Sequence, residues 1–567
     1  MGAEGGAAGP EGVGAAGAAG DGTAARTVFD LVERAARAGP EAIYALDAEG
    51  HHALTFAALR AGCGAVQARL RALGSAPGDT VSLVMPNGLA TLQWLLGAMH
   101  GGWCVNPVNL LSQPEQMRYV LAHSDCKVVC ASAQWEAPVR ALLPWLGRPV
   151  ALEVVDPARP VEVAAADASD DAAVATPADA PMDAPIDAPI GAPIGAPEPP
   201  SPDSLALLMY TSGTTGQPKG VMLTQANLAA SALAIGAEHG LGPGDRVLGV
   251  LPLYHINAFA VTMLAPLAHR GSVVLPPKFS AGQFWAQAIE GQCTWINVVP
   301  TMIAFLLDAA AQGGAPPRER LARIRFCRSA SSALAPEHHR AFEATFGIGI
   351  VETMGLTETV APAFSNPLDA ARRKIGSVGR ASGCDARIIG KDLQPLRDEQ
   401  VGQTGELAIR GPQVMRGYYK NPEATAAAFT PDGWLRTGDL GHRDAEGFFF
   451  VTGRIKELII KGGENIAPRE IDEALLKHPA VLDAAAVGLP DARYGQEVAA
   501  CVVLREGAAR GAAEEAALQR ELLAHGEAEL GRFKAPRLLR IVAELPRGPS
   551  GKVQRLKLVE LFVPAAR

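Results

Sequence analysis

A ten-residue segment rich in glycine and hydroxyl side chains gives the chain its clearest chemical signal. Residues 211–220 read Thr-Ser-Gly-Thr-Thr-Gly-Gln-Pro-Lys-Gly and follow an apolar run at 205–210 that is typical of a β-strand. Glycine lets the backbone approach an anion closely, hydroxyl and amide groups donate to phosphate oxygens, and Lys219 adds a cation. The spacing is neither that of the nucleotide P-loop nor that of the Rossmann fingerprint. The segment predicts a phosphate-binding loop of a different type, and a flexible surface loop is the alternative interpretation.

Six further motifs flank or follow this loop in a fixed order. They are Leu-Pro-Leu-Tyr-His-Ile-Asn-Ala-Phe at 251–259, Arg-Ser-Ala-Ser-Ser-Ala-Leu at 328–334, Met-Gly-Leu-Thr-Glu at 354–358, Trp-Leu-Arg-Thr-Gly-Asp at 434–439, Gly-Arg-Ile-Lys-Glu at 453–457 and Pro-Arg-Gly-Pro-Ser-Gly-Lys at 546–552. With the glycine-rich loop, this set resembles the motifs of the AMP-forming adenylating superfamily, which includes acyl-CoA synthetases, aryl-CoA ligases, luciferases and peptide-synthetase adenylation domains. The resemblance runs from about residue 28 to residue 560, apart from the segment 155–203.

The resemblance implies a two-step reaction. A carboxylate attacks the α-phosphate of ATP, pyrophosphate leaves, and the acyl-AMP then transfers its acyl group to CoA. Both first-step reactants are anions, so the site must neutralise charge and align them. Transfer to a free-standing carrier protein is the alternative, because the same active site would serve it. A catalytically dead homologue that acts as a scaffold is a third hypothesis, and the intact set of charged motif residues argues against it.

The resemblance also assigns roles to single residues of the nucleotide site. Glu358 matches the ligand of Mg²⁺, a cation that prefers hard oxygen ligands. Thr357 is placed to contact a phosphate oxygen, and Asp439 to accept the two ribose hydroxyls. Met354 stands where the family usually has an aromatic residue on the adenine. The residues that the resemblance assigns to ATP or AMP are Thr211, Ser212, Gly213, Thr214, Thr215, Gly216, Lys219, Ser329, Ala330, Ser331, Met354, Gly355, Asp439 and Arg454.

A smaller and mobile C-terminal domain is implied to supply the remaining groups. Lys552 would bridge the carboxylate and α-phosphate oxygens in the first step, with Glu358 and Thr357 as the other catalytic residues. Lys456 matches the hinge about which the small domain turns. Lys461, Gly462 and Gly463 would line the pantetheine channel in the second arrangement, where Gly463 would leave room for the thiol arm.

The candidate acyl pocket consists of residues from the second motif and from the strand that follows it: His255, Asn257, Ala258, Val299 and Met302. These residues are mostly small or apolar, and no buried cation is evident beside them. We therefore expect a monocarboxylate with an aliphatic or aryl tail, such as a fatty acid or an aryl acid. His338 and His339 are adjacent in the chain, so we expect them to lie at the surface.

Strand-like and helix-like segments alternate along most of the chain, which predicts an α/β architecture with largely parallel sheets. Thr55 is a plausible N-cap for a helix over 55–73, and a strand is expected at 80–85. Near the C-terminus we expect strands at 457–460, 484–487 and 498–504, with a helix at 468–477. The predicted organisation is a disordered Gly/Ala tail at 1–25, a large domain of α/β layers at 26–453 and a small α+β domain at 454–567. Proline at every fourth position predicts a disordered Ala/Pro/Asp insertion at 155–203.

Composition narrows the remaining possibilities. The chain of 567 residues has a formal net charge of −8, 48% hydrophobic and 19% charged residues, which suits a folded protein and not a general nucleic-acid binder. The eight cysteines are scattered, so unpaired thiols are expected and a zinc site is not. No run long enough to span a membrane and no signal peptide is evident, which predicts a cytoplasmic protein. The expected ligands are ATP, Mg²⁺, CoA and a small carboxylic acid, while a homodimer and a carrier-protein partner are left open.

Overall fold

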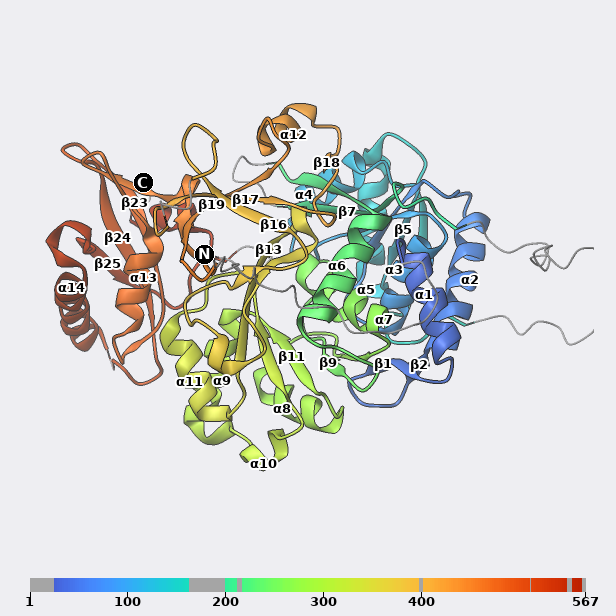
Figure 1. The fold of residues 1–567 in the computed structure, drawn as a ribbon, viewed down its shortest axis with the longest axis horizontal. Coiled ribbons are helices and arrows are strands. Elements are labelled where there is room, and N and C mark those ends of the chain that lie inside the picture. The colour runs from blue at the N-terminus through green and yellow to red at the C-terminus, as the bar shows by residue number, and fades with distance from the viewer. Residues whose placement is uncertain are drawn as a thin grey trace, which may run out of the picture.

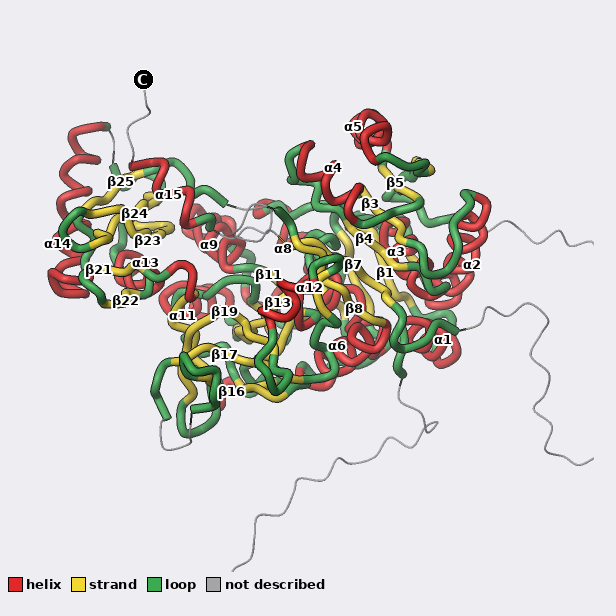
Figure 2. Tube along the Cα trace, turned by 90° about the horizontal axis from the view of Figure 1, so that it is seen from above, coloured by secondary structure: helices red, strands yellow, loops and turns green. Residues whose placement is uncertain are grey.

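The computed structural model describes residues 25–162, 199–211, 217–396, 401–509, 511–547 and 553–562 (Figure 1). In this part of the chain the strands form two large sheets, a four-stranded sheet and a five-stranded sheet. Figure 2 shows the five-stranded sheet and its helices at one end of the molecule, beside the layers that the rest of the chain builds. The predicted combination of a large layered α/β domain and a small α+β domain is confirmed.

The seven-stranded sheet carries the entrance to the glycine-rich loop. Its middle strands are parallel, whereas β7 and β8 form an antiparallel hairpin whose connection is the segment 212–218. In spatial order the strands are β18 (Gly417–Tyr418), β8 (Lys219–Thr224), β7 (Leu205–Thr211), β4 (Cys104–Pro107), β3 (Thr80–Val84), β5 (Val128–Ala131) and β6 (Ala151–Val154).

The nine-stranded sheet carries the motifs at 251–259, 328–334 and 354–358 on its strands or on the loops that follow them. Its central strands are parallel, so their carboxyl ends meet at one edge, which is where open α/β sheets bind ligands. The loops after β11 and β12 are therefore neighbours at that edge. In spatial order the strands are β15 (Arg380–Ala381), β14 (Ala361–Ser365), β13 (Ile350–Leu356), β12 (Phe326–Ser329), β11 (Trp295–Val298), β9 (Arg246–Leu248), β10 (Ser272–Leu275), β1 (Ile43–Asp47) and β2 (Ala53–Thr55).

Helices join the two large sheets in one hydrophobic core, which contains residues of both sheets together with the buried faces of α1, α2, α3, α6 and α7. The buried Tyr44 hydroxyl donates to the Met263 carbonyl at 2.9 Å and ties β1 to this layer. The helices of the large domain are α1 (Val28–Ala38), α2 (Phe56–Ala72), α3 (Leu89–His100), α4 (Pro114–His123), α5 (Ala133–Leu142), α6 (Gln225–Glu238), α7 (Ala265–His269), α8 (Ala281–Glu290), α9 (Pro300–Ala309), α10 (Arg318–Leu321), α11 (Pro336–Phe346) and α12 (Pro422–Ala428).

The C-terminal part continues from an antiparallel sheet made of β16 (Asp385–Ile389), β17 (Gly405–Arg410), β19 (Leu435–Arg443) and β20 (Phe449–Arg454). A 3₁₀ turn over Ile455–Glu457 then leads into the five-stranded sheet, which has its own apolar core. Its elements are β21 (Ile459–Lys461), β22 (Glu464–Ile466), α13 (Pro468–Leu476), β23 (Val481–Asp491), β24 (Gly495–Leu504), α14 (Ala512–Lys534), β25 (Leu538–Ile541) and α15 (Arg555–Phe562).

Several local predictions can be compared with these elements. The Thr55 hydroxyl accepts from the Ala58 amide, so the predicted N-cap of α2 is confirmed. The strand expected at 457–460 is wrong at its start, because Glu457 ends the 3₁₀ turn. The insertion was expected to start at residue 155, yet Val155 and Val161 pack against the main core, so the structured chain continues to residue 162. The tail 1–24 and residues 163–198 of the insertion lie outside the described residues.

The eight cysteines are all unpaired, and all but Cys384 are buried, as predicted. No helix in the described part of the chain is both long and apolar enough to cross a membrane.

Candidate active site

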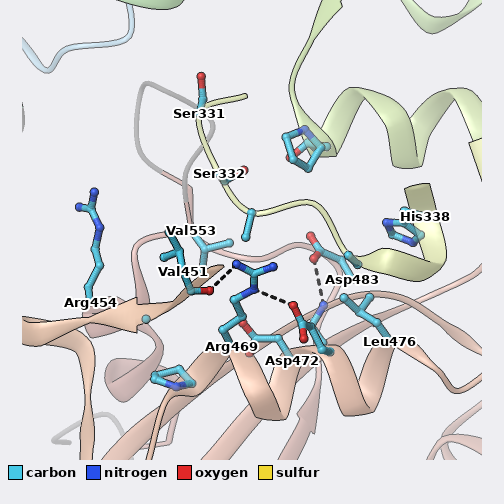
Figure 3. Close-up of a pocket in the computed structure, with 18 of the residues that line it drawn as sticks. Ser331, Ser332, His338, Val451, Arg454, Arg469, Asp472, Leu476, Asp483 and Val553 are labelled. Atoms are coloured by element: carbon cyan, nitrogen blue, oxygen red, sulfur yellow. Dashed lines mark hydrogen bonds and ion pairs between the residues drawn. The ribbon is translucent and has the colours of Figure 1, made fainter. Parts of the chain in front are cut away.

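A cavity of about 270 Å³ lies where the large domain meets the five-stranded part, and it gathers residues from five of the predicted motifs. Ser331 lines it from the loop after β12, and Met354 and Gly355 line it from the end of β13 in the nine-stranded sheet. Asp439 and Arg454 line it from the four-stranded sheet. In Figure 3, Ser331 and Ser332 lie on a loop opposite α13, the helix that carries Arg469 and Asp472. Segments more than 200 residues apart in sequence thus share one site.

The part of the cavity predicted to hold ribose contains a paired acid and base. Asp439 on β19 faces Arg454 on β20 in the strand register, and Arg454 Nε donates to Asp439 Oδ1 at 2.8 Å. Asp439 is buried, and its negative charge raises the pKa of Arg454. The hydrogen bond from Arg454 fixes the carboxylate in position, which suits an acceptor for two hydroxyl groups.

Residues on both sides of Lys552 line the same cavity. Arg547 and Val553 pair with each other as an isolated β-bridge, and both belong to the cavity wall. The Arg547 guanidinium contacts Asp483, and the Arg555 guanidinium contacts Asp472, so both ends of the segment are anchored to the small domain. Lys552 itself lies outside the described residues, but it is one peptide unit from Val553.

The residues predicted to contact phosphate and Mg²⁺ meet through a tyrosine that sequence analysis did not identify. The Tyr418 hydroxyl donates to Glu358 Oε1 at 2.8 Å, and Lys219 Nζ lies 4.8 Å from the centre of the Tyr418 ring. The half-buried Glu358 carboxylate is an oxygen ligand of the kind that Mg²⁺ prefers. The described residues form no cluster of three metal-ligating side chains. A single carboxylate fits Mg²⁺ that is otherwise held by phosphates and water. The loop residues Ser212, Gly213, Thr214, Thr215 and Gly216 lie outside the described residues, whereas Thr211 ends β7.

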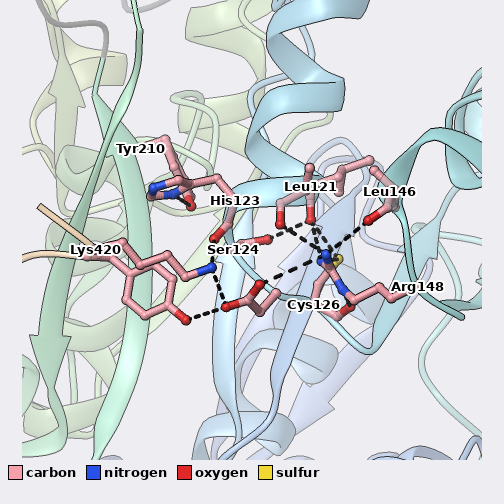
Figure 4. A network of polar contacts seen from close by, with 11 residues as sticks. Leu121, His123, Ser124, Cys126, Leu146, Arg148, Tyr210 and Lys420 are labelled. Carbon is pink, nitrogen blue, oxygen red and sulfur yellow. Dashed lines mark hydrogen bonds and ion pairs between the residues drawn. The ribbon is translucent and has the colours of Figure 1, made fainter.

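A polar network holds the base of that loop (Figure 4). The Tyr210 hydroxyl is 2.8 Å from His123 Nδ1, directly before the loop begins. Asp125 accepts from Tyr419 at 2.8 Å and pairs with Lys420 at 2.6 Å, next to Tyr418 in the chain. The network therefore connects the strand that leads into the loop with the segment that follows Tyr418.

The candidate acyl pocket contains a buried positive charge, which corrects the expectation that none was present. Arg328 on β12 is 1% exposed, and its Nη1 donates to Asn257 Oδ1 at 2.7 Å and to Asn297 Oδ1 at 2.9 Å. No carboxylate among the described residues forms an ion pair with Arg328. Burial lowers the pKa of Arg328 to about 9, so the guanidinium keeps its charge at neutral pH. The sequence placed this residue at the start of the adenine motif, where nothing revealed that it points into the core.

Other predicted residues lie outside the cavity wall. Ala258 is fully buried in the main core, Ser329 and Ala330 are buried, and Val299 and Met302 are half-buried against the core. In their neighbourhood Pro300, Thr301 and Ala304 line the cavity instead, because α9 begins at Pro300 and turns this face outward. His255 and Thr357 are half-buried, and Lys456 is exposed within the 3₁₀ turn.

The predicted channel residues have structural roles of their own. Gly462 and Gly463 form the two-residue turn between β21 and β22 with φ values of +59° and +86°, a conformation that favours glycine at both positions. The Lys461 ammonium is buried, where it pairs with Glu497 and donates to the Phe533 carbonyl. The positive charge of Lys461 is therefore neutralised within the small domain.

Two titratable groups of the cavity wall, His338 and Glu352, differ from what the sequence suggested. His338 is 8% exposed and lines the cavity, and its neighbour His339 is 3% exposed, so the expectation that both lie at the surface is wrong. The pair lies in the first turn of α11, where both side chains are buried. Glu352 on β13 is fully enclosed, and burial raises its pKa to about 7.

Comparisons with known proteins agree with this geometry. The sequence model of the AMP-binding enzyme family matches residues 32–419, and that of the AMP-binding enzyme C-terminal domain matches residues 470–552. The sulfoacetate–CoA ligase of Cupriavidus necator is 55% identical over 533 residues, which cover 94% of this chain and 97% of that protein. The oxalate–CoA ligase of Arabidopsis thaliana is 34% identical, with 95% and 99% covered.

Among solved structures, ATP-bound MatB from Rhodopseudomonas palustris superposes with a TM-score of 0.79 at 27% identity, covering 95% of this chain and 99% of that one. A benzoate CoA ligase from Burkholderia xenovorans superposes with a TM-score of 0.77 at 26% identity, with 94% and 99% covered. The matches span both domains, so the chain belongs to the family of AMP-binding enzymes and is an AMP-forming acid–thiol ligase that uses ATP and CoA.

Proposed function

We propose that this ligase activates a short carboxylic acid that carries a second anionic group, with sulfoacetate as the first candidate, and transfers it to CoA. The observation that carries the reaction is the interdomain cavity, where Asp439 and Arg454 face the residues that flank Lys552. The acid is inferred from the 55% identity to a sulfoacetate–CoA ligase over nearly the full length of both chains. The expectation of a fatty or aryl acid is replaced, because it depended on the absence of a buried cation.

The side chains divide the work of the first step. Lys219 and the loop before it hold the β- and γ-phosphates, and Asp439 accepts the ribose hydroxyls. Lys552 places its ammonium between the carboxylate and the α-phosphate, where negative charge accumulates as the bond to phosphorus forms. Glu358 holds Mg²⁺, which neutralises phosphate charge when bound. The carboxylate oxygen becomes part of the acyl-AMP, and pyrophosphate leaves.

The second step uses the same cavity after the small domain has turned about Lys456. The thiol of CoA attacks the acyl carbonyl and AMP leaves with the bonding electrons of the acyl–oxygen bond. We propose CoA and not a carrier protein as the acceptor, since the relatives named above are CoA ligases. The homodimer and the cytoplasmic location stay predictions.

A substrate screen tests this proposal. Pyrophosphate release is measured with ATP and CoA on sulfoacetate, oxalate, acetate, propionate, octanoate and benzoate, and thioesters are identified by mass spectrometry. We expect the highest kcat/KM with an acid that carries a second anionic group, and we expect sulfoacetyl-CoA as a product. Highest kcat/KM with octanoate or benzoate would contradict the proposed acid class, while thioester formation only on an added carrier protein would contradict the proposed acceptor.

A further inference from the structure

Arg328 is a buried cation whose observed partners are neutral. The side chains that accept from its Nη1 are two asparagine amides, and its Nε has no hydrogen-bond partner among the described residues. Removing a charge from water costs several kcal/mol unless an opposite charge or a set of hydrogen bonds replaces the solvent. An arginine that served only to connect strands would gain from a carboxylate, and no described carboxylate pairs with it. The local arrangement therefore leaves positive charge available to a bound anion.

The amide of Asn257 links this charge to the cavity. Asn257 Oδ1 accepts from Arg328 at 2.7 Å and from Asn297 Nδ2 at 3.2 Å, which fixes the orientation of the amide. The opposite end of the amide, Nδ2, donates to Ser331 Oγ at 3.1 Å. Because the Ser331 oxygen accepts this bond, its own proton is free to be donated elsewhere. Ser331 lines the cavity, so the chain of dipoles that starts at Arg328 ends in a donor at the cavity wall.

The backbone holds two members of this chain, Asn257 and Ser331, in uncommon conformations. Asn257 is the first residue of a π-helical segment, Asn257–Leu264, a form that is frequent at functional sites. Ser331 has φ +77°, which is uncommon for a residue other than glycine. Such a conformation persists only where the surrounding structure holds it, and it directs Ser331 toward the cavity.

We infer that Arg328 is a specificity-determining residue, which acts through Asn257 and Ser331 to favour acids that carry a second anionic group. This inference rests on the proposed function, because it concerns the acid bound in the same cavity. Arg328 is a positioning residue: Ser331 makes the contact, and the buried charge polarises the donor and raises the potential at the wall. An acid of the same size that lacks the second anionic group makes no such contact with the wall.

Asn297→Asp tests the inference without touching the cavity. Asn297 is fully buried on β11 and 2.9 Å from Arg328 Nη1, so an aspartate there gives Arg328 a charged partner. The selectivity, defined as the ratio of kcat/KM for sulfoacetate to that for propionate, is expected to fall by about 10-fold or more, since a compensated charge no longer favours an anion at the wall. The same ratio is measured with oxalate in place of sulfoacetate. The KM for ATP of the Asn297→Asp variant is expected to change little.

Asn297→Ala is the matched control, because it removes the same amide and adds no charge. We expect it to keep the selectivity within about 2-fold of the original chain. Arg328→Met is a second variant that should also lose the selectivity, and thermal unfolding shows whether each variant is folded. A folded Asn297→Asp variant with unchanged selectivity would overturn the inference, as would equal losses in Asn297→Asp and Asn297→Ala. If the unmodified chain prefers propionate to both charged acids, the proposed function fails before the variants are compared.

Discussion

Tyr418 shows how much of the site depends on contacts between residues that are distant in sequence. Its hydroxyl bonds to Glu358, and its ring lies beside the Lys219 ammonium. The hydrogen bond to a carboxylate is charge-assisted, and the pKa of Tyr418 is raised by burial and by Glu358, so the hydroxyl stays a donor at neutral pH. One side chain therefore positions both the predicted metal ligand and the predicted phosphate-binding lysine.

Tyr418→Phe removes the hydroxyl and keeps the ring. We expect binding of MgATP to weaken by roughly 10-fold, the size of one hydrogen bond to a charged group. Isothermal titration with MgATP in the absence of the acid measures this directly. Tyr419→Phe is the control, because it loses a similar hydrogen bond to Asp125 but not the contact with Glu358. Equal weakening in both variants would assign Tyr418 a purely structural role.

The buried carboxyl group of Glu352 should make the stability of the fold depend on pH. Burial raises the pKa of Glu352 to about 7, and the negative charge of Glu473 acts in the same direction. The positive charge of Arg469 and the hydrogen bond from the Leu334 amide lower the pKa and only partly offset burial. A carboxyl group whose folded-state pKa exceeds its unfolded value stabilises the fold fully below the unfolded pKa. This contribution is lost as the pH rises from about 4.5 to about 7.

Glu352→Gln stays neutral at every pH, so it should lack this loss. We expect the variant to gain stability relative to the original chain between pH 5 and pH 8, by roughly 2–3 kcal/mol at most. Chemical unfolding at the two pH values measures the difference. A difference between the two chains that does not depend on pH would show that Glu352 does not titrate in this range.

Sequence patterns predicted the positions of helices and strands better than they predicted which side chains are buried. The N-cap at Thr55, the strand that begins at Thr80 and the helix that begins at Pro468 follow from local capping and periodicity, and the structure contains all three. The burial of Arg328 and His338 could not be predicted in this way, because it depends on which face of a strand or helix meets another layer. The role of Tyr418 was equally inaccessible, since Glu358 lies 60 residues away.

The Ala/Pro/Asp insertion allows a test at the scale of one segment. The chain before it is held by Gln93, whose side chain accepts from the Val161 amide at 2.7 Å, and by the Pro157 carbonyl, which accepts from Ala90 at the start of α3. Replacing residues 163–198 by a short Gly/Ser linker should leave turnover nearly unchanged and shift the Tm by no more than about 2 °C, because loop-closure entropy varies slowly with length. Turnover and differential scanning calorimetry measure the two effects.

A longer deletion is the matched control. Removing residues 157–198 also removes the contacts to Ala90 and Gln93, so we expect a clearly lower Tm. A large loss of activity in a folded variant that lacks only residues 163–198 would show that the insertion takes part in function.

In the complete enzyme, one cavity serves both reactions of the proposed mechanism. The structure brings Arg547 and Val553, on either side of Lys552, to the wall that also carries Asp439 and Ser331. This arrangement suits the first reaction, in which a lysine contacts the attacking carboxylate. The turn at Gly462 and Gly463 belongs to another edge of the small domain and is not part of this wall. In the proposed mechanism the small domain presents a different face for the second reaction.

Separate rates of acyl-AMP formation and of thioester formation in the Lys552→Ala variant test whether the small domain presents two different faces. We expect the variant to form acyl-AMP from the acid and ATP at least about 100-fold more slowly, as for the loss of one preorganised charge. Supplied acyl-AMP and CoA should still give thioester at close to the original rate. Gly463→Asn is the opposite variant, because asparagine tolerates the left-handed backbone but fills space at the turn; it should slow only thioester formation. Equal slowing of both half-reactions in Lys552→Ala would show that the two faces of the small domain do not alternate.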